Sequence, residues 1–406
     1  MLLKNILRSV LIVGLLLVFS SSSLYSIPSF ARKYGLDCSA CHNPIPRLNA
    51  YGFKFRAAGF RLPKEIGQNV SSENIGDYLA ARIQERWDVG RSVNSAGTAS
   101  SSNQFTLHEI NLYPATGAFG TYLSAFNEIT FPAGEIPQIE NSYIKATFGD
   151  EDAFYTIKAG IFHAYEGYGA SDRSLGNNKL LFITSTAASS VFAPWTDQVG
   201  IELGYAIDNT FIRATVFNGL NDNGDAAVGG AFKKTKGSPS YNSKDIQLFV
   251  NQILTKDGGG LSGYFYHGSV DLTSGATVYQ NNYNRYAFYG SYPFQNILAL
   301  AGYEKGQDQA FDATTSKVNG TYGSSGLFGE LNYKIQDPFW IGVRFSQFDP
   351  TESVNNNSVS LITAMVHYSL QNGLYFVGEF NHQQTDLEAN LNKKDDTFQL
   401  RIAFVY

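Results

Sequence analysis

The larger part of the chain, residues 76–406, repeats segments of roughly ten residues in which apolar side chains occupy every second position. In one of them, Val199, Ile201 and Leu203 alternate with Gly200 and Glu202. A strand with this period turns one face to an apolar environment and the other to a polar one. Segments of this length and pattern are typical of strands in a transmembrane β-barrel.

Sixteen such segments occur, joined alternately by short turns and longer loops. The segments are 76–89, 104–113, 118–131, 138–149, 153–163, 198–206, 210–218, 244–254, 259–270, 283–292, 297–305, 325–335, 339–348, 358–370, 374–382 and 397–406. The predicted short turns include 114–117, and the predicted longer loops include 164–197, 219–243, 306–324 and 383–396. This pattern predicts an all-β, porin-like, 16-stranded barrel with both termini in the periplasm. The alternative, a soluble β-sandwich, does not explain the regular alternation of loop lengths.

Composition agrees with a barrel in the bacterial outer membrane. Only 16% of the residues are charged, whereas Gly, Tyr and Phe number 39, 25 and 30. Fewer charges than usual, with many aromatic residues, favour β-structure and contact with lipid. The net charge of −5 and the lack of a Lys/Arg cluster predict no nucleic-acid partner.

Residues 1–26 are predicted to be a secretory signal peptide. Lys4 and Arg8 precede an apolar run over 10–19, and small residues follow over 20–26. This arrangement of charge, apolar core and small residues directs export. The apolar run is shorter than a transmembrane anchor requires, so we expect an exported mature chain.

Between the signal peptide and the barrel lies Cys38-Ser39-Ala40-Cys41-His42, which holds both cysteines of the protein. The C-x-x-C-H pattern predicts one covalent haem c, with thioethers from the cysteines and His42 as the proximal iron ligand. A redox dithiol and half a zinc site are the alternatives. Residues 27–70 are therefore predicted to be a small monohaem cytochrome segment with one short helix within 44–60. This segment of residues 27–70 is too small to bury a core without the covalent haem, so we expect it to plug the barrel.

Other haem contacts are predicted from side chains that face the barrel lumen. Met365 and His367 are candidates for the sixth iron ligand, although Met365 can equally fill space, and a water-bound iron is the third option. Among the charged residues predicted to face the lumen, Arg82 and Arg86 are nearest in sequence to the haem segment, and they are candidates to pair with the propionates. Further charged residues are predicted to face the lumen, as is ordinary for porins: Lys145, Lys158, Arg213, Arg344, Arg401, Glu109, Glu202, Glu330 and Glu379. The remaining histidines are predicted to lie in loops or interfaces: His108, His163, His267 and His382.

The region around the haem motif resembles the fused cytochrome–porin family of outer-membrane iron oxidases. The resemblance spans about thirty residues and consists of a Phe-Ala-Arg lead, the haem motif and a Pro-x-Leu-Asn-x-aromatic-Gly stretch. The matching residues are Phe30, Ala31, Arg32, Gly35, Cys38, Cys41, His42, Pro46, Leu48, Asn49, Tyr51, Gly52, Phe55 and Gly59. Over the barrel the resemblance extends only to architecture and length.

The resemblance implies an Fe(II):cytochrome c oxidoreductase that takes electrons from extracellular Fe(II) and passes them to a periplasmic c-type cytochrome. Two other functions are open. One is a porin or solute channel that the haem segment plugs or gates. The other is an electron conduit for a different extracellular redox partner.

Overall fold

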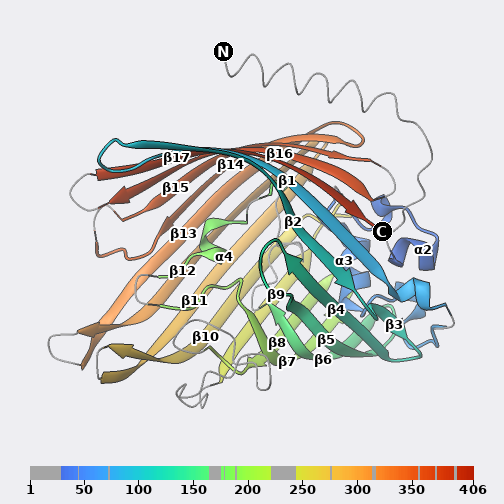
Figure 1. Cartoon of the computed structure of the whole chain (residues 1–406). Helices are drawn as coiled ribbons and strands as arrows, with labels where there is room; N and C mark the ends of the chain where they lie inside the picture. The colour runs from blue at the N-terminus through green and yellow to red at the C-terminus, as the bar shows by residue number, and fades with distance from the viewer. Residues whose placement is uncertain are drawn as a thin grey trace.

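The described strands form one antiparallel sheet that closes into a barrel, because the first strand pairs with the last. The computed structural model describes residues 29–43, 45–71, 74–163, 175–177, 179–187, 190–220, 244–274, 277–312, 317–354, 357–370, 373–387 and 391–406. The predicted signal peptide lies outside the described residues. Figure 1 shows the tilted strands of the barrel, with the C-terminus near helices α2 and α3.

The strands follow one another in sequence around the barrel. They are β1 Ala80–Val93, β2 Ala99–Tyr113, β3 Gly117–Phe119, β4 Leu123–Pro132, β5 Gln138–Gly149, β6 Ala153–His163, β7 Asp197–Ile207, β8 Thr210–Phe217, β9 Asp245–Ile253, β10 Gly260–Ser274, β11 Thr277–Phe294, β12 Ile297–Asp312, β13 Lys317–Gln336, β14 Phe339–Asp349, β15 Val359–Ser369, β16 Leu374–Leu387 and β17 Leu391–Val405. Each predicted segment corresponds to one position in the barrel.

Strands β2 and β3 share one of these positions, so the barrel has sixteen strands. β2 pairs with the end of β4, and β3 pairs with its beginning. The predicted turn at 114–117 is therefore wrong: these residues interrupt the strand, and the chain reverses at 120–122. Thr116 explains the interruption, because its Oγ1 donates to the Asn127 carbonyl (3.2 Å) and accepts from the Asn127 N–H (3.1 Å). These bonds hold the chain beside β4 instead of letting it turn.

The two faces of each strand meet different surroundings, as the alternation predicts. On β7, Ile201 and Leu203 are more than half exposed on the outer face, whereas Glu202 between them is buried. On β15, Ile362 and Val366 face outward while Met365 is buried in the lumen. The apolar outer face suits lipid, and a closed sheet leaves no edge strand with unpaired backbone groups in the bilayer. The chain is therefore a porin-like outer-membrane β-barrel.

Several strands continue past the point where the apolar pattern ends. β12 and β13 pair as far as Asp312 with Lys317, and β16 and β17 as far as Leu387 with Leu391. The predicted loops at 306–324 and 383–396 are therefore mostly strand. Polar residues occupy both faces in these extensions, which indicates that they stand in water beyond the bilayer. The predicted loop at 219–243 lies almost entirely outside the described residues.

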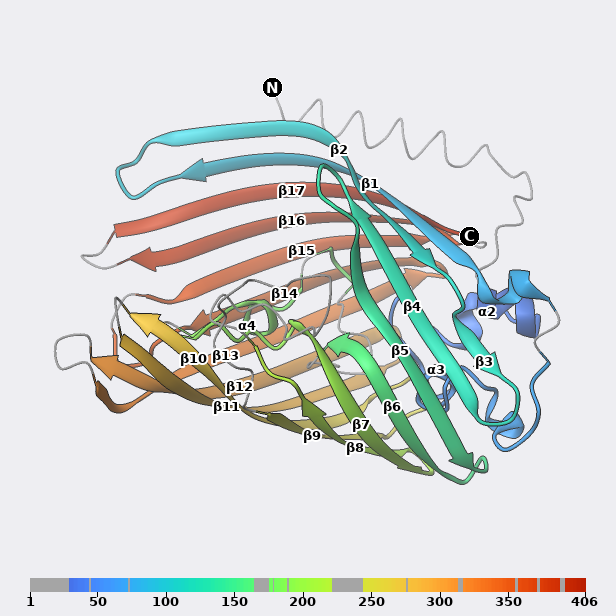
Figure 2. The same ribbon diagram turned by 60° about the horizontal axis from the view of Figure 1, so that its bottom comes forward.

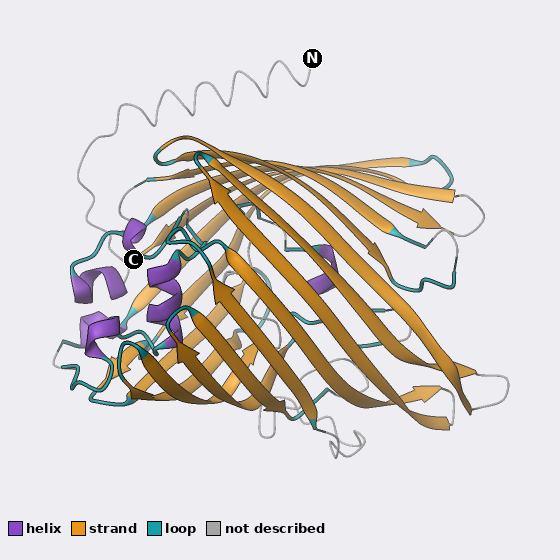
Figure 3. Cartoon of the chain, turned by 180° about the vertical axis from the view of Figure 1, so that it is seen from behind, coloured by secondary structure: helices purple, strands orange, loops and turns teal. Residues whose placement is uncertain are grey.

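Residues 29–79, here called the N-terminal segment, lie at the short-turn end of the barrel, as Figures 1 and 3 show. Short turns face the periplasm in barrels of this class. The segment contains α2 Ser29–Tyr34, the 3-10 turns η1 Cys38–Ala40, η2 Pro63–Glu65 and η3 Ile75–Tyr78, and helix α3 Ala50–Ala57. The helix predicted within 44–60 is thus confirmed but is limited to one segment of eight residues.

Side chains of the N-terminal segment reach the barrel wall and lumen. The buried Arg61 guanidinium donates to three carbonyls of the β3–β4 hairpin, at Gly120 (2.8 Å), Phe119 (3.3 Å) and Leu123 (2.7 Å). Deeper inside, Arg47 forms an ion pair of 2.8 Å with Glu330 on β13. The segment is therefore docked in the mouth of the barrel and not merely tethered beside it.

Further along the lumen, helix α4 Leu181–Thr184 and its flanking residues fold inward, as Figure 2 shows. Phe182 stacks against Tyr289 (5.9 Å between ring centroids), and Phe192 stacks against Tyr266 (4.3 Å). An apolar cluster thus fills part of the lumen, within the region predicted as the loop 164–197. Among the described residues, no helix has the length and apolar character needed to cross a membrane.

Candidate functional site

The two cysteines and His42 are brought together by a tight 3-10 turn. The backbone N–H groups of Cys41 and His42 both donate to the Cys38 carbonyl, at 3.2 and 3.0 Å. This turn brings both thiols and the imidazole to the wall of one cavity. The spacing C-x-x-C-H therefore has a direct structural meaning, because it gathers three chemically active side chains on one surface.

Asn49 joins this turn to helix α3. Its side-chain Nδ2 donates to the carbonyls of Ala40 (2.9 Å) and Ser39 (3.3 Å), and its Oδ1 accepts from the Gly52 N–H (2.9 Å) as the N-cap of the helix. Its own backbone N–H donates to the Cys41 carbonyl (2.9 Å). Asn is a preferred N-cap residue because its side chain replaces a missing helical acceptor. One residue therefore fixes both the turn and the start of the helix.

Gly52 allows the helix to approach the haem-motif turn, and its replacement by alanine should disrupt the site. A Cβ at this position would lie 2.2 Å from the Cys41 carbonyl oxygen, a contact with rigid backbone. Overpacking of this kind costs about 1–3 kcal/mol. We expect Gly52→Ala to lower haem incorporation, measured as haem absorbance per unit of protein. Gly329→Ala is the control, since a Cβ added at that position would meet nothing within 4 Å; equal haem content in the two variants would contradict this prediction.

His42 is oriented as a metal ligand would be. Its Nδ1 lies 3.2 Å from the carbonyl oxygens of both Pro46 and Arg47. Since carbonyls only accept, Nδ1 carries the ring proton, and Nε2 is the nitrogen with a lone pair to offer. Ligating histidines generally donate their other nitrogen to a carbonyl or carboxylate in this way. Burial also lowers the pKa of His42, which favours the neutral, ligating form of the ring.

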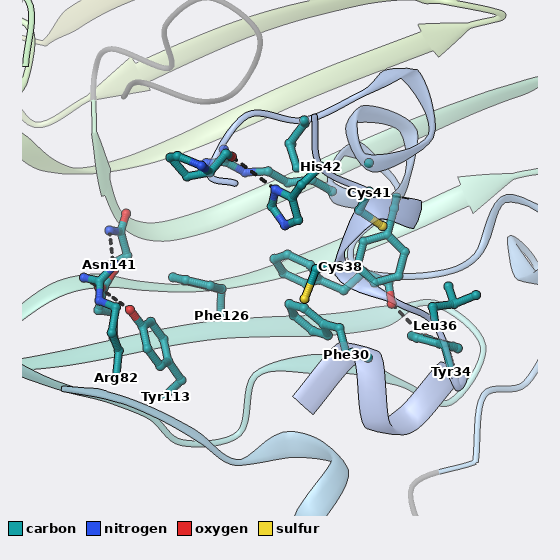
Figure 4. A pocket seen from close by; sticks show the side chains of 18 of the residues that line it. Phe30, Tyr34, Leu36, Cys38, Cys41, His42, Arg82, Tyr113, Phe126 and Asn141 are labelled. Carbon is teal, nitrogen blue, oxygen red and sulfur yellow. Dashed lines mark hydrogen bonds and ion pairs between the residues drawn. The ribbon is translucent and has the colours of Figure 1, made fainter. Parts of the chain in front are cut away.

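The cavity beside His42 has a volume of about 370 Å³ and two unlike ends. Several aromatic side chains line it: Phe30, Tyr34, Phe55, Phe60 and Phe126. Polar side chains gather elsewhere in it: Arg82, Tyr113, Glu128, Glu140, Asn141 and His163. Figure 4 shows the two cysteines and His42 at one side and Arg82 with Tyr113 at the other, with Phe126 between them.

This division fits a covalently attached haem. A porphyrin bound through its vinyl groups needs thiols at one edge, apolar walls along its faces and polar groups at the opposite edge, where the propionates leave. The aromatic walls, the axial imidazole and the polar end of the cavity supply each of these. A reactive dithiol would need a lowered thiol pKa, whereas burial raises the pKa of Cys38, and of Cys41 to about 11. The site therefore suits haem attachment better than dithiol chemistry.

Of the two arginines predicted to pair with the haem propionates, one lines the cavity beside His42 and the other does not. Arg82 lines it and is held by Glu109 (3.1 Å), Glu128 (3.5 Å) and Asn111 (3.0 Å). Arg86 instead lines a second cavity of about 440 Å³ on the long-loop side and pairs with the neighbouring Asp88.

Met365 and His367 lie in the lumen as predicted, but neither lines the cavity of His42. Met365 belongs to the apolar cluster around α4, and His367 Nε2 lies 2.6 Å from the Ser369 hydroxyl. The structure therefore brings neither residue to the cysteines.

His163 lines the cavity of His42, although the sequence predicted a loop or interface role for it. Its Nδ1 lies 3.1 Å from the Trp195 carbonyl and 2.5 Å from Asp197 Oδ1, and its ring stacks on Trp195. The position of His163 at the end of β6 does not predict that it lines a cavity. That placement depends on its contact with Trp195, which precedes β7.

The two cavities touch at a polar partition. Glu140 lines both of them, and Arg82 of the first forms its ion pair with Glu109 of the second. The second cavity is lined further by His108, Lys179, Asp395 and Arg401, among others. Polar side chains therefore connect the haem-motif cavity with the long-loop side of the barrel.

Comparison with known proteins bears on the fold alone. No family model and no curated protein matches the chain. Among solved structures, it is similar to an anion-selective porin from Comamonas acidovorans, with 10% identity and a TM-score of 0.55 over 81% of this chain and 98% of the porin. The outer membrane channel DcaP of Acinetobacter baumannii is 10% identical to this chain, with a TM-score of 0.53 over 81% of this chain and 97% of DcaP. Salmonella typhi OmpF, in complex with daunomycin, is 10% identical, with a TM-score of 0.52 over 80% of this chain and 97% of OmpF.

Proposed function

We propose that this chain is an outer-membrane electron conduit with one haem c, attached through Cys38 and Cys41 and ligated by His42. In this proposal, residues 27–70 are a monohaem cytochrome segment fused to the barrel of residues 76–406. Electrons come from an extracellular donor, Fe(II) foremost, and leave to a periplasmic c-type cytochrome. The bound haem supplies one-electron chemistry, and the protein supplies its attachment, orientation and surroundings.

One observation carries the proposal: the C-x-x-C-H turn faces a cavity in the mouth of a membrane barrel, with His42 already oriented by two carbonyls. A soluble cytochrome would not need the barrel, and a simple channel would not need the motif. The buried ion pair between Arg47 and Glu330 supports a permanent place for the motif inside the barrel mouth.

The two sides of the site suit the two proposed partners. On the long-loop side, the second cavity and the partition at Glu140 offer a polar approach for a small hydrated cation. On the short-turn side, Tyr51 is exposed on α3, the helix that packs on the haem-motif turn, so a periplasmic protein can approach there. Arg82, at the polar end of the cavity, is the residue we assign to the propionates.

A solute channel is the second candidate, favoured by the likeness to channel-forming barrels. It predicts that small sugars pass through the intact holo-protein. Against it stand the N-terminal segment docked in one mouth and the apolar cluster around α4 in the lumen. Swelling of liposomes that contain the holo-protein measures this passage, and rapid swelling would favour the channel.

The proposed donor is tested by mixing oxidised holo-protein, made with a c-type maturation system, with Fe(II) under anaerobic conditions. We expect the absorption bands of reduced haem c to appear, with one Fe(II) consumed for each haem. Dithionite provides the control, since it reduces any accessible haem. Reduction by dithionite but not by Fe(II) would refute Fe(II) as donor and leave a different extracellular redox partner.

A further inference from the structure

A group of charged side chains, three of them buried and two half-buried, lies next to the haem-motif cavity and takes no part in attachment of the haem. It comprises Arg56 on α3, Lys145 on β5, Lys158 on β6 and Arg213 on β8, with the carboxylate of Glu202 on β7. We call it the lumen cation cluster. Lys145, Lys158 and Glu202 are each more than nine-tenths buried. The cluster therefore concentrates positive charge where water screens it poorly.

Contacts within the lumen cation cluster fix it in place. Lys158 Nζ lies 3.0 Å from Glu202 Oε2. Lys145 Nζ lies 3.4 Å from the Arg56 carbonyl and 3.3 Å from the Ala57 carbonyl, at the C-terminal end of α3. The charges of Lys145, Lys158 and Arg213 act on one another and on Arg56. Basic side chains thus outnumber the carboxylate of Glu202 within the cluster.

The lumen cation cluster lies directly against the haem-motif cavity. Arg56 and Tyr143 line that cavity and also the smaller cavity that contains Lys145, Glu202 and Arg213. The ammonium group of Lys158 lies 5.3 Å from the centroid of the Tyr143 ring. The cluster therefore shares part of its wall with the haem-motif cavity.

We propose that the lumen cation cluster raises the reduction potential of the haem attached at Cys38 and Cys41, and so fits the conduit to donors of high potential. This inference rests on the proposed function. Reduction adds one electron from the donor and lowers the charge at the haem iron by one. Fixed positive charges stabilise the reduced form in a medium of low dielectric constant. Charge and burial around a haem are established determinants of its potential.

Two substitutions of opposite sign test this inference in the full-length holo-protein. Lys158→Met removes a positive charge and should shift the midpoint potential downward. Glu202→Gln removes the negative charge and should shift it upward. Spectroelectrochemical titration of the haem in detergent measures both shifts. Because Lys158 and Glu202 are buried, the shifts should persist at high ionic strength, at which surface charges are screened.

A merely structural effect cannot imitate this result, since a loosened site would move both variants in the same direction. Lys305→Met is the control, because Lys305 pairs with Glu352 at an exposed site away from the cluster. The midpoint potential of the haem in this variant should match that of the wild type. If Lys158→Met fails to fold, Lys145→Met replaces it with the same expected sign. Absent shifts, or shifts of one sign, would overturn the inference.

The outcome separates this inference from the proposed function. Opposite shifts without reduction by Fe(II) would support the cluster's role and refute the donor. Reduction by Fe(II) without opposite shifts would refute the cluster's role and leave the conduit. A wild-type protein that attaches no haem would overturn both.

Discussion

Replacing both Cys38 and Cys41 with serine is expected to abolish covalent haem attachment while the barrel still assembles. A serine hydroxyl does not form the thioether that a thiol forms with a porphyrin vinyl group. The barrel should persist because its closure depends on the pairing of β1 with β17, to which the cysteines do not contribute. Haem staining after denaturing electrophoresis should fall to background. The heat-dependent mobility typical of a folded barrel should remain.

Single-histidine variants test whether His42 is the axial ligand. His42→Ala should keep the covalent haem but change its absorption spectrum and potential, because the thioethers do not need the imidazole. His267→Ala is the matched control, since His267 is exposed on β10 and bonds Asn284 at 2.9 Å. Covalent haem in the double serine variant would contradict the predicted attachment, and an unaltered spectrum in His42→Ala would remove His42 as ligand.

Glu330→Ala is expected to destabilise the docking of the N-terminal segment by about 3–5 kcal/mol, the usual cost of removing one partner from a buried ion pair. Glu330 accepts from Arg47 at 2.8 Å, and its other oxygen lies 3.7 Å from Arg344 Nη1. Loss of the carboxylate leaves two buried guanidinium groups without this shared anion. We expect unfolding at lower denaturant concentration and faster proteolysis of the N-terminal segment.

The matched control is an ion pair of similar chemistry at an exposed site. Glu352→Gln breaks the pair with Lys305, and exposed pairs contribute about 0–1 kcal/mol. Its unfolding midpoint should therefore stay near that of the wild type. If Glu330→Ala and Glu352→Gln behaved alike, Arg47 would not hold the N-terminal segment in the barrel.

The alternating pattern predicts the barrel because each strand that crosses the bilayer must present an apolar face to lipid, whichever strands are its neighbours. Ile201 and Leu203 had to face lipid and Glu202 had to avoid it, whichever strands became their neighbours. Beyond the bilayer a strand needs no apolar face, so the alternation stops there. The polar extensions of β12, β13, β16 and β17 are for this reason predicted as loops although they are strands. The pattern also failed at 114–117, where turn-forming residues are held beside β4 by the Thr116 hydroxyl.

Two features could be predicted from the sequence alone: the periodic strands of a barrel and the C-x-x-C-H turn at Cys38, Cys41 and His42, where we propose that haem is attached. Both are local, since alternation and the C-x-x-C-H spacing act within a few residues of backbone. Only the tertiary structure decided what surrounds that turn. Barrel closure places Arg82 at the far end of the cavity and keeps Met365 outside it. Such placements depend on strand register and on helix docking, which join residues hundreds of positions apart.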